Sequence, residues 1–264
     1  DRDGIIQPDA IAEAIRDDTM LISVMYANNE VGTIQPISEI GRIARQRDIP
    51  FHTDAVQAGG TLDIDVEALN VDMLSLSAHK FYGPKGVGLL YVRRQTPILW
   101  QQSGGAQENN HRAGTENVAG IVGMSKALQL TEENREAENS RLIALRQRLI
   151  NGLKERVPGT RLNGHPEQRL PNNVNVSFEG VEGETLLLNL DMNRIGASSG
   201  SACTTGATEP SHVLTALGLS STQVNGSLRL TLGKSNDEAQ VDRTIDVLEE
   251  AVTRLRRMAT ATAD

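Results

Sequence analysis

Apolar residues recur along the chain with two spacings, one typical of buried strands and the other of amphipathic helices. Short apolar runs in the first half predict strands at residues 21–26, 50–54, 71–76 and 87–92. Helical spacing predicts helices at residues 8–16 and 36–46. Because strands and helices alternate here, we expect β-α-β units, a mostly parallel sheet and right-handed crossovers.

The second half has a different pattern, which begins with a long helical stretch at residues 118–156. The middle of this stretch is almost wholly polar, and we place a domain boundary there. The remaining pattern predicts strands at 173–178, 195–198 and 227–232 and helices at 183–192 and 237–258. We therefore predict a large α/β domain at residues 1–134 and a small α+β domain at residues 135–264.

Composition argues against several classes of protein. The 264 residues are 38% hydrophobic, and no apolar run reaches the roughly 18 to 20 residues of a membrane span. The net charge of −8, without a basic block, argues against a nucleic-acid partner. A single cysteine excludes an internal disulfide and fits a reducing compartment, so we expect a cytoplasmic protein. Its histidines and cysteine lack metal-ligand spacing, so we expect no metal site.

Lys80 lies where a solubilising lysine is not expected. The predicted strand ending at Leu76 is followed by Ser77, His79 and Lys80, and then by glycines and a proline before the next strand. An amine held between two strands can lose its proton through desolvation and form a Schiff base with a carbonyl group. Ser77 and His79 offer a hydroxyl and an imidazole to an anion. The alternative is a surface lysine in a β-turn.

Asp54 ends the predicted strand 50–54, and Gln57 follows three residues later. A carboxylate at the C-terminal end of a strand in an α/β sheet points into the ligand crevice. An aspartate and a Schiff-base lysine together are the pair that pyridoxal phosphate needs, because the acid keeps the pyridine nitrogen protonated. Asp54 alone would more often be a cap or a turn residue.

Three other positions carry groups with chemical potential. Asn29 follows a predicted strand, where its amide either forms an ordinary turn or faces a cofactor. Arg229 lies inside a predicted strand and either pairs with an internal acid or binds an anion such as a carboxylate. Cys203 lies in a run of small residues, which predicts a mobile loop at 197–209. A lone cysteine is either an inert filler or, in such a polar loop, a reactive thiol.

Six motifs of the chain, in the same order, resemble those of the group I (NifS/IscS-like) cysteine desulfurases. This family is the aminotransferase class V-like branch of the fold-type I enzymes that use pyridoxal 5'-phosphate. The matching residues are 25–32 (MYANNEVG), 52–57 (HTDAVQ), 77–80 (SAHK) with 82–86 (YGPKG), 112–117 (RAGTEN), 198–203 (SSGSAC) and 209–214 (EPSHVL). The resemblance extends from about residue 3 to residue 256.

The resemblance implies a pyridoxal-phosphate site. In the family, the residue matching Lys80 carries the cofactor as a Schiff base, the one matching Asp54 bonds the pyridine nitrogen, and the one matching Gln57 bonds the phenolic oxygen. The phosphate contacts implied in the same way fall on Ser77, His79 and Thr115. The segment that contains Thr115 crosses a dimer interface in the family, so Thr115 would reach the cofactor phosphate of the partner subunit.

The resemblance also implies the substrate contacts and the reaction. Arg229, helped by Asn29, would bind the α-carboxylate of free L-cysteine. With Lys80, His79 and Cys203 as the catalytic residues, the enzyme would release L-alanine and keep the sulfur as a persulfide on Cys203. The expected partners are a second copy of the chain and a sulfur-acceptor protein, such as a scaffold for iron-sulfur cluster assembly.

Two alternatives stay open at this stage. One is another fold-type I enzyme, such as a selenocysteine or cystine lyase or an aminotransferase, and the other is a non-catalytic fragment. The chain also departs from the family pattern, because family members have a further N-terminal portion with a phosphate-binding turn and a histidine that stacks on the cofactor. We therefore expect either a truncated chain or a separate N-terminal piece that supplies these groups.

Overall fold

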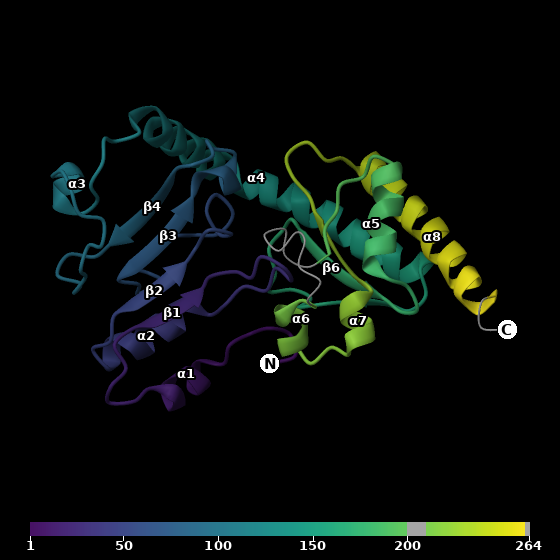
Figure 1. Cartoon of the computed structure of the whole chain (residues 1–264), viewed down its shortest axis with the longest axis horizontal. Coiled ribbons are helices and arrows are strands. Elements are labelled where there is room, and N and C mark those ends of the chain that lie inside the picture. The colour runs from purple at the N-terminus through teal and green to yellow at the C-terminus, as the bar shows by residue number, and fades with distance from the viewer. Residues whose placement is uncertain (200–209, 262–264) are drawn as a thin grey trace. The chain divides into compact units, whose positions relative to one another are not determined.

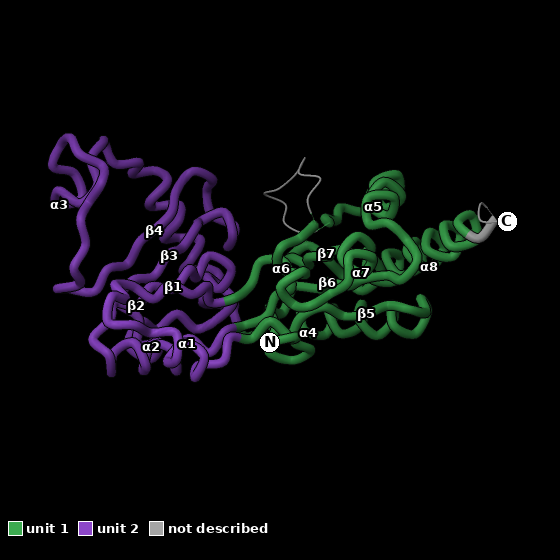
Figure 2. The backbone as a smooth tube through the Cα atoms, turned by 60° about the horizontal axis from the view of Figure 1, so that its bottom comes forward, with its two compact units in different colours: residues 1–5, 27–34, 136–264 green, residues 6–26, 35–135 purple. Residues whose placement is uncertain are grey.

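The computed structural model describes residues 1–199 and 210–261, which form two compact units (Figure 2). Unit 2 consists of Ile6–Tyr26 and Gln35–Arg135, and unit 1 consists of Asp1–Ile5, Ala27–Ile34 and Glu136–Asp264. This division differs from a simple cut near residue 134, because residues 1–5 and 27–34 pack with the C-terminal half of the chain.

Within the described residues, unit 2 is built on a four-stranded sheet in the order β1-β2-β3-β4 (Figure 1). Its strands are β1 (Ile22–Met25), β2 (Phe51–Asp54), β3 (Met73–Ser77) and β4 (Gly88–Val92). The first three run parallel, whereas β4 pairs antiparallel with β3. The predicted α/β fold with a mostly parallel sheet is therefore confirmed.

The core residues of unit 2 that pack under helix α2 (Ile37–Gln46) lie on one face of its sheet. Helix α2 turns Ile37 and Ile40 inward, where they pack in one cluster with Phe51 and Leu74. Helix α1 (Pro8–Ala14) contributes no fully buried residue. Side chains alternate along a strand, so Asp54 at the end of β2 and Ser77 at the end of β3 lie on the face opposite to Phe51 and Leu74.

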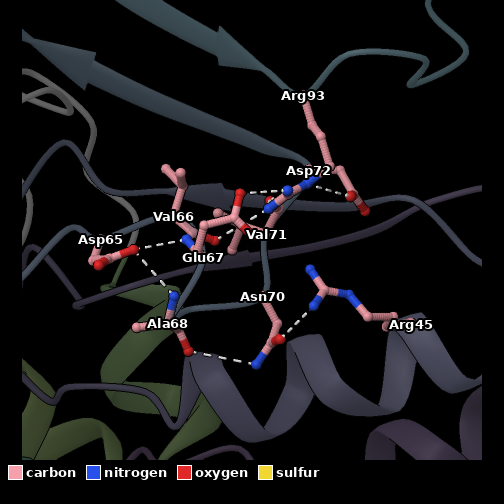
Figure 3. Close-up of polar contacts among 9 residues, drawn as sticks. All are labelled: Arg45, Asp65, Val66, Glu67, Ala68, Asn70, Val71, Asp72 and Arg93. Carbon is pink, nitrogen blue, oxygen red and sulfur yellow. Dashed lines mark hydrogen bonds and ion pairs between the residues drawn. The ribbon is translucent and has the colours of Figure 1, made fainter.

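Arg93, just after β4, ties the start of β2 and β3 together (Figure 3). Its guanidinium donates to a carboxylate oxygen of Glu67 at 2.6 Å and to the carbonyl of Val71 at 2.9 Å, and it pairs with Asp72 at 3.3 Å. Asp72 in turn accepts a bond from the backbone N–H of Phe51 at 2.9 Å. These contacts fix the N-terminal ends of both strands and leave their C-terminal ends for other groups.

The rest of unit 2 follows β3 and β4. A single 3₁₀ turn, η1 (Ala78–Phe81), comes directly after β3, and a short irregular helix, α3 (Gln107–Asn110), lies in the predicted polar segment 101–117. Helix α4 (Val118–Arg156) begins in unit 2 and contributes its residues from 136 onward to unit 1.

Unit 1 contains an antiparallel sheet in the order β5-β6-β7, covered by helices of the C-terminal half (Figure 1). Its further elements are β5 (Thr160–Leu162), β6 (Asn173–Phe178), α5 (Gly183–Met192), α6 (His212–Ala216), α7 (Ser221–Asn225), β7 (Ser227–Thr231) and α8 (Glu238–Ala261). Every residue of the central strand β6 is buried. Leu153, Phe178, Leu186 and Leu248 meet in the core, each fully shielded from solvent.

The structure confirms the predicted bounds of β6 and α5. It differs from the prediction at residues 195–198 and at three short elements. The predicted strand 195–198 is wrong, because only Ser198 pairs with β7, through an isolated bridge to Arg229. The sequence pattern also missed β5, α6 and α7, which are each three to five residues long and too short to show a period. Among the described residues, no helix has both the length and the apolar character required to cross a membrane.

Candidate functional site

The C-terminal ends of β2 and β3 bring several predicted site residues to one edge of the sheet of unit 2. Asp54 is the last residue of β2 and lies opposite Ser75 in the register with β3. One of its carboxylate oxygens accepts a bond from the backbone N–H of Val56 at 2.9 Å, which holds the half-buried side chain in place. Gln57 follows in the same turn and is also half-buried. This is the edge at which open α/β sheets bind ligands.

The turn η1 displays the next two residues of the predicted site. Ala78 and Phe81 point into the core and are at most 1% exposed, whereas His79 and Lys80 between them are exposed. This pattern follows from the turn itself, because a 3₁₀ turn returns to the same face every third residue. Two apolar side chains therefore anchor the turn while an imidazole and an amine project from it.

Ser77 and His79 are joined at the start of this turn. The Ser77 hydroxyl and the Nδ1 atom of His79 lie 3.1 Å apart, so the two side chains form one hydrogen-bonding pair. The turn closes at Gly83, whose N–H donates to the Ala78 carbonyl at 2.8 Å. An added Cβ at Gly83 would lie 2.9 Å from Ala78, so only glycine fits this close approach.

Lys80 differs from the expectation in one respect. The sequence led us to expect an amine whose burial between two strands would desolvate it. The structure instead leaves the Lys80 side chain exposed, because η1 turns it away from the core that Ala78 and Phe81 fill. Desolvation by the described residues is therefore not what would activate this amine.

His52 is a polar residue of this region that the sequence analysis quoted but assigned no role. Its Nδ1 atom lies 2.8 Å from the Ser23 hydroxyl on β1, and its Nε2 atom lies 2.9 Å from the Ser75 hydroxyl on β3. Burial lowers the pKa of His52 below its ordinary value, and the neighbouring Asp54 carboxylate partly offsets that effect. The spacing of His52 and Asp54, two residues apart on one strand, was the available signal for a shared face.

Thr115 lies in the segment between β4 and α4. That segment is held by Ala113, which is 5% exposed and whose carbonyl accepts bonds from Gln102 at 3.2 Å and from Arg112 at 2.9 Å. Thr115 itself is exposed. The structure therefore presents its hydroxyl at the surface of unit 2, and its contact with a partner subunit stays a prediction.

In unit 1, Asn29 and Arg229 are brought together although they are 200 residues apart in sequence. The Nη1 atom of Arg229 donates to the main-chain carbonyl of Asn29 at 2.9 Å. Arg229 lies on β7 and is half-buried, and its backbone also pairs with Ser198. The predicted carboxylate-binding pair therefore exists as a contact, made through the backbone of Asn29.

Residues Asn28 to Val31, which we call the 28–31 platform, are held by side chains on every side. The side-chain oxygen of Asn28 accepts bonds from the N–H groups of Glu30 and Val31 at 2.8 and 2.9 Å. The Glu30 carbonyl accepts bonds from the amides of Asn173 and Asn175 on β6, each at 3.1 Å. Because these amides lie in the rigid, buried strand β6, the platform is fixed to the core of unit 1.

Arg169 completes the support of the platform. It is 3% exposed, and its guanidinium donates to the Val31 carbonyl at 2.6 Å and also to the carbonyl of Asn163. Burial, together with the charge of nearby Arg146, lowers the pKa of Arg169 to about 10. Arg169 thus remains a cation at neutral pH and holds main-chain oxygens.

The structure places the predicted site residues in two groups. Asp54, Gln57, Ser77, His79 and Lys80 share one sheet edge in unit 2, and Asn29 and Arg229 share a contact in unit 1. Cys203 lies outside the described residues. The described residues contain no group of three or more His, Cys, Asp or Glu side chains that could hold a metal ion.

The unit 2 group suits a cofactor with three distinct parts. A carboxylate at a strand end can hold a protonated ring nitrogen, an exposed amine can bond covalently to an aldehyde, and a hydroxyl paired with an imidazole can donate to a phosphate. The observed sheet edge supplies all of these at the C-terminal ends of two adjacent parallel strands and in the turn η1 that follows β3, in Asp54, the Ser77–His79 pair and Lys80. The residues present therefore fit pyridoxal phosphate.

Comparison with known proteins agrees with this fold and donor set. Residues 1–244 match the model of the aminotransferase class-V family, and the chain belongs to this family. The resemblance to NifS/IscS-like cysteine desulfurases that the motifs indicated is thereby confirmed.

Individual relatives carry more specific names. The chain is 56% identical over 262 residues to the "Cysteine desulfurase IscS" of Methanosarcina thermophila, an alignment that covers 99% of this chain and 65% of that protein. Among solved structures, a "NIFS-LIKE PROTEIN" matches with a TM-score of 0.87 and 37% identity, over 96% of this chain and 66% of the other. "SspA in complex with cysteine" matches with a TM-score of 0.73 and 38% identity, over 88% and 64%. The chain thus spans slightly less than two thirds of the length of such relatives.

Proposed function

We propose that this protein is a cysteine desulfurase that uses pyridoxal phosphate, converts L-cysteine to L-alanine and keeps the sulfur as a persulfide on Cys203. The observation that carries the proposal is the sheet edge of unit 2, where Asp54 and Ser77 end adjacent parallel strands and the turn after Ser77 presents His79 and Lys80. The names of the relatives support the choice of reaction, and one of the similar structures is described as a complex with cysteine.

Each residue of unit 2 has a defined task in this proposal. Pyridoxal phosphate, when bound, supplies an electron sink that makes the bonds at the substrate's α-carbon easier to break. Lys80 would hold the cofactor covalently and, once the substrate amine had displaced it, would move the proton of the substrate's α-carbon. Asp54 would keep a proton on the ring nitrogen, Gln57 would bond the phenolic oxygen, and Ser77 and His79 would hold the phosphate.

The substrate side of the proposal rests on unit 1. The planar fork of Arg229 suits a carboxylate, and its bond to the carbonyl of Asn29 fixes one edge of that fork. Asn29 would help to orient the same carboxylate through its side-chain amide. The Cys203 thiolate would then attack the substrate sulfur, so that a sulfur–sulfur bond forms as the carbon–sulfur bond breaks. The electron pair of the broken bond stays with the substrate carbon, which takes up a proton to give alanine.

The partners follow from the same chemistry. A persulfide must be passed on, so we propose a sulfur-acceptor protein, for example a scaffold for iron-sulfur clusters. We also propose a homodimer in which Thr115 of one subunit contacts the cofactor phosphate of the other. A separate N-terminal piece, or flanking sequence of the same gene product, would supply further cofactor contacts. The single cysteine favours a reducing compartment, the cytoplasm.

The decisive experiment measures alanine and sulfur together. The protein, with its natural flanking sequence where the gene encodes one, is loaded with pyridoxal phosphate and given L-cysteine. Wild type should release alanine and gain the mass of one sulfur atom, and Cys203→Ser should do neither while it still binds cysteine. Full alanine production by Cys203→Ser would instead indicate a selenocysteine- or cystine-type lyase. A protein that never takes up the cofactor would be the non-catalytic alternative.

A further inference from the structure

Glu30 is a buried carboxylate to which the proposed mechanism gives no task. It belongs to the 28–31 platform and is only 2% exposed. Its Oε2 atom accepts a hydrogen bond of 2.5 Å from the hydroxyl of Ser211, a residue 181 positions away in sequence. A bond of this length between a hydroxyl and a carboxylate is in the range of charge-assisted hydrogen bonds, which are stronger than neutral ones.

The Ser211 hydroxyl donates one hydrogen bond, to Glu30, and accepts another. As the N-cap of α6, its oxygen accepts a bond from the backbone N–H of Leu214 at 3.2 Å. A hydroxyl has only one proton, and the bond to Glu30 determines where that proton points. The remaining lone pairs then face the helix, so Glu30 orients the cap of α6 as well as binding it.

Apolar contacts next to this bond hold the same two segments together. Val31, the neighbour of Glu30, is 1% exposed and packs in one cluster with Leu214, which is fully buried, and with Leu217. The first turn of α6 is therefore docked on the 28–31 platform by a polar bond and by a small apolar cluster.

The platform also supports the residues on the other side of the undescribed segment. Ser198 pairs with the backbone of Arg229, through N–H to oxygen distances of 3.1 and 2.6 Å. Arg229 in turn donates to Asn29 of the platform. Ser198 and Ser211, which flank Cys203 in sequence, are therefore both linked to residues 29 and 30.

We propose that Glu30 is a positioning residue for sulfur transfer, acting through Ser211. This inference rests on the proposed function, in which Cys203 takes the sulfur. Cys203 is eight residues before Ser211 in the sequence. The bond to Glu30 therefore holds one end of the segment that carries Cys203 to the same platform as Arg229, the proposed carboxylate-binding residue.

The geometry predicts a particular kinetic signature. Arg229 bonds to the main-chain oxygen of Asn29, and the main chain of the next residue, Glu30, is held by bonds to Asn28 and Asn175 that do not use the Glu30 side chain. Removal of the Glu30 carboxylate should therefore leave the binding of cysteine intact. It should slow the step in which sulfur moves to Cys203, because Ser211 loses its polar link to the platform and only the apolar contacts remain.

The test compares variants of the cofactor-loaded protein. Glu30→Ala and Ser211→Ala should each lower the rate of persulfide formation by about 10- to 100-fold, the range expected for loss of a hydrogen bond to a charged group. The KM for cysteine, and the midpoint of the spectral change that cysteine causes in the bound cofactor, should change less than about twofold. The double variant should be no slower than the worse single variant, because both remove one bond.

Ser220→Ala is the matched control. Ser220 caps the neighbouring short helix α7 in the same way, by accepting a bond from the N–H of Gln223, but it is exposed. Its loss should leave persulfide formation unchanged. Ser211→Thr, which retains a hydroxyl, should restore most of the rate. If Glu30→Ala does not fold, Glu30→Gln and Ser211→Ala carry the test, since each keeps the shape of the site.

Each outcome has a definite meaning. Persulfide formation at the wild-type rate in Glu30→Ala and Ser211→Ala would overturn the positioning role alone. A parallel loss of cysteine binding would also overturn it, because Glu30 would then act by holding the platform in shape. A wild-type protein that releases no alanine from cysteine would overturn the proposed function, and the positioning role with it.

Discussion

The sheet edge of unit 2 and the 28–31 platform of unit 1 hold their polar groups in opposite ways. His79 and Lys80 project into solvent from a turn that is anchored by buried Ala78 and Phe81. The platform instead buries Glu30 and is held by buried amides, with each contact made to the main chain or to another fixed group. The turn after β3 exposes its polar side chains, whereas the 28–31 platform is a buried, hydrogen-bonded segment of main chain.

This difference indicates what each region should lose on mutation. An exposed reactive group makes few contacts, so its removal should abolish chemistry with little effect on stability. Removal of a buried amide that holds the 28–31 platform should instead lower stability, because buried hydrogen bonds are lost. The predictions below use this contrast, beginning with the largest expected effect.

Lys80→Ala should reduce alanine production to background, since no other group in the turn can bond covalently to the cofactor. Its midpoint of thermal unfolding without cofactor should remain that of wild type, because the side chain is exposed. Lys85→Ala, which removes the other lysine of the same motif, is the control and should keep activity. Borohydride reduction that labels Lys85 in place of Lys80 would contradict the assignment.

Asn175→Ala should lower the free energy of unfolding by about 2 to 3 kcal/mol, because it removes two buried hydrogen bonds, one to the Glu30 carbonyl and one from the Asn163 amide. Urea denaturation measures the change. Asn151→Ala, which removes an exposed asparagine of α4 that bonds only along its own helix, should cost less than about 0.5 kcal/mol. Equal losses of stability at both positions would mean that the buried amide bonds of Asn175 do not stabilise the protein.

Arg229→Ala should raise the KM for cysteine about tenfold or more, as expected when a charged hydrogen bond to a carboxylate is lost. Uptake of pyridoxal phosphate, followed by its visible absorbance, should be little changed, because the residues proposed to bond its ring and phosphate belong to unit 2. Arg161→Ala, on the exposed side of β5, controls for the loss of charge. An unchanged KM in Arg229→Ala would show that the carboxylate binds elsewhere.

His52 should give the smallest effect, and it depends on pH. Its pKa is lowered in the folded protein, mainly by burial, so the unfolded chain binds more protons near pH 6. Stability from this residue is therefore present above about pH 6.5 and is lost as the pH falls through the lower, folded pKa. NMR titration should give a His52 midpoint below 6.5, and His52→Gln should flatten the stability profile between about pH 5 and 7. A midpoint above 6.5 would contradict the assigned cause.

Sequence periodicity was sufficient for elements whose burial is regular. The fully buried strand β6 and the amphipathic helix α2 follow directly from their patterns, and the glycine-bearing turn after β3 identified Lys80. The short helices α6 and α7 could not be found in this way, because they are defined by the caps at Ser211 and Ser220. Their stability comes from tertiary contacts that a local pattern does not record.

The candidate site was predictable only as far as single residues. Asp54 and Lys80 could be placed at strand ends, but nothing local links Asn29 to Arg229 or Glu30 to Ser211, because these contacts join residues 200 and 181 positions apart. The row of hydroxyls around His52 likewise depends on the register of three strands. The expected burial of Lys80 failed because a 3₁₀ turn follows β3 directly.

The bond between Arg229 and the main-chain oxygen of Asn29 has a consequence for divergence within the family. A carbonyl oxygen is the same in every amino acid, so a change of side chain at position 29 leaves the orientation of Arg229 intact. The guanidinium that we propose to bind the substrate's carboxylate can therefore keep its orientation while the side chain at position 29 varies. Under the proposed function, substitutions at position 29 could therefore accumulate during evolution without loss of the Arg229 contact that would bind the carboxylate of an amino-acid substrate.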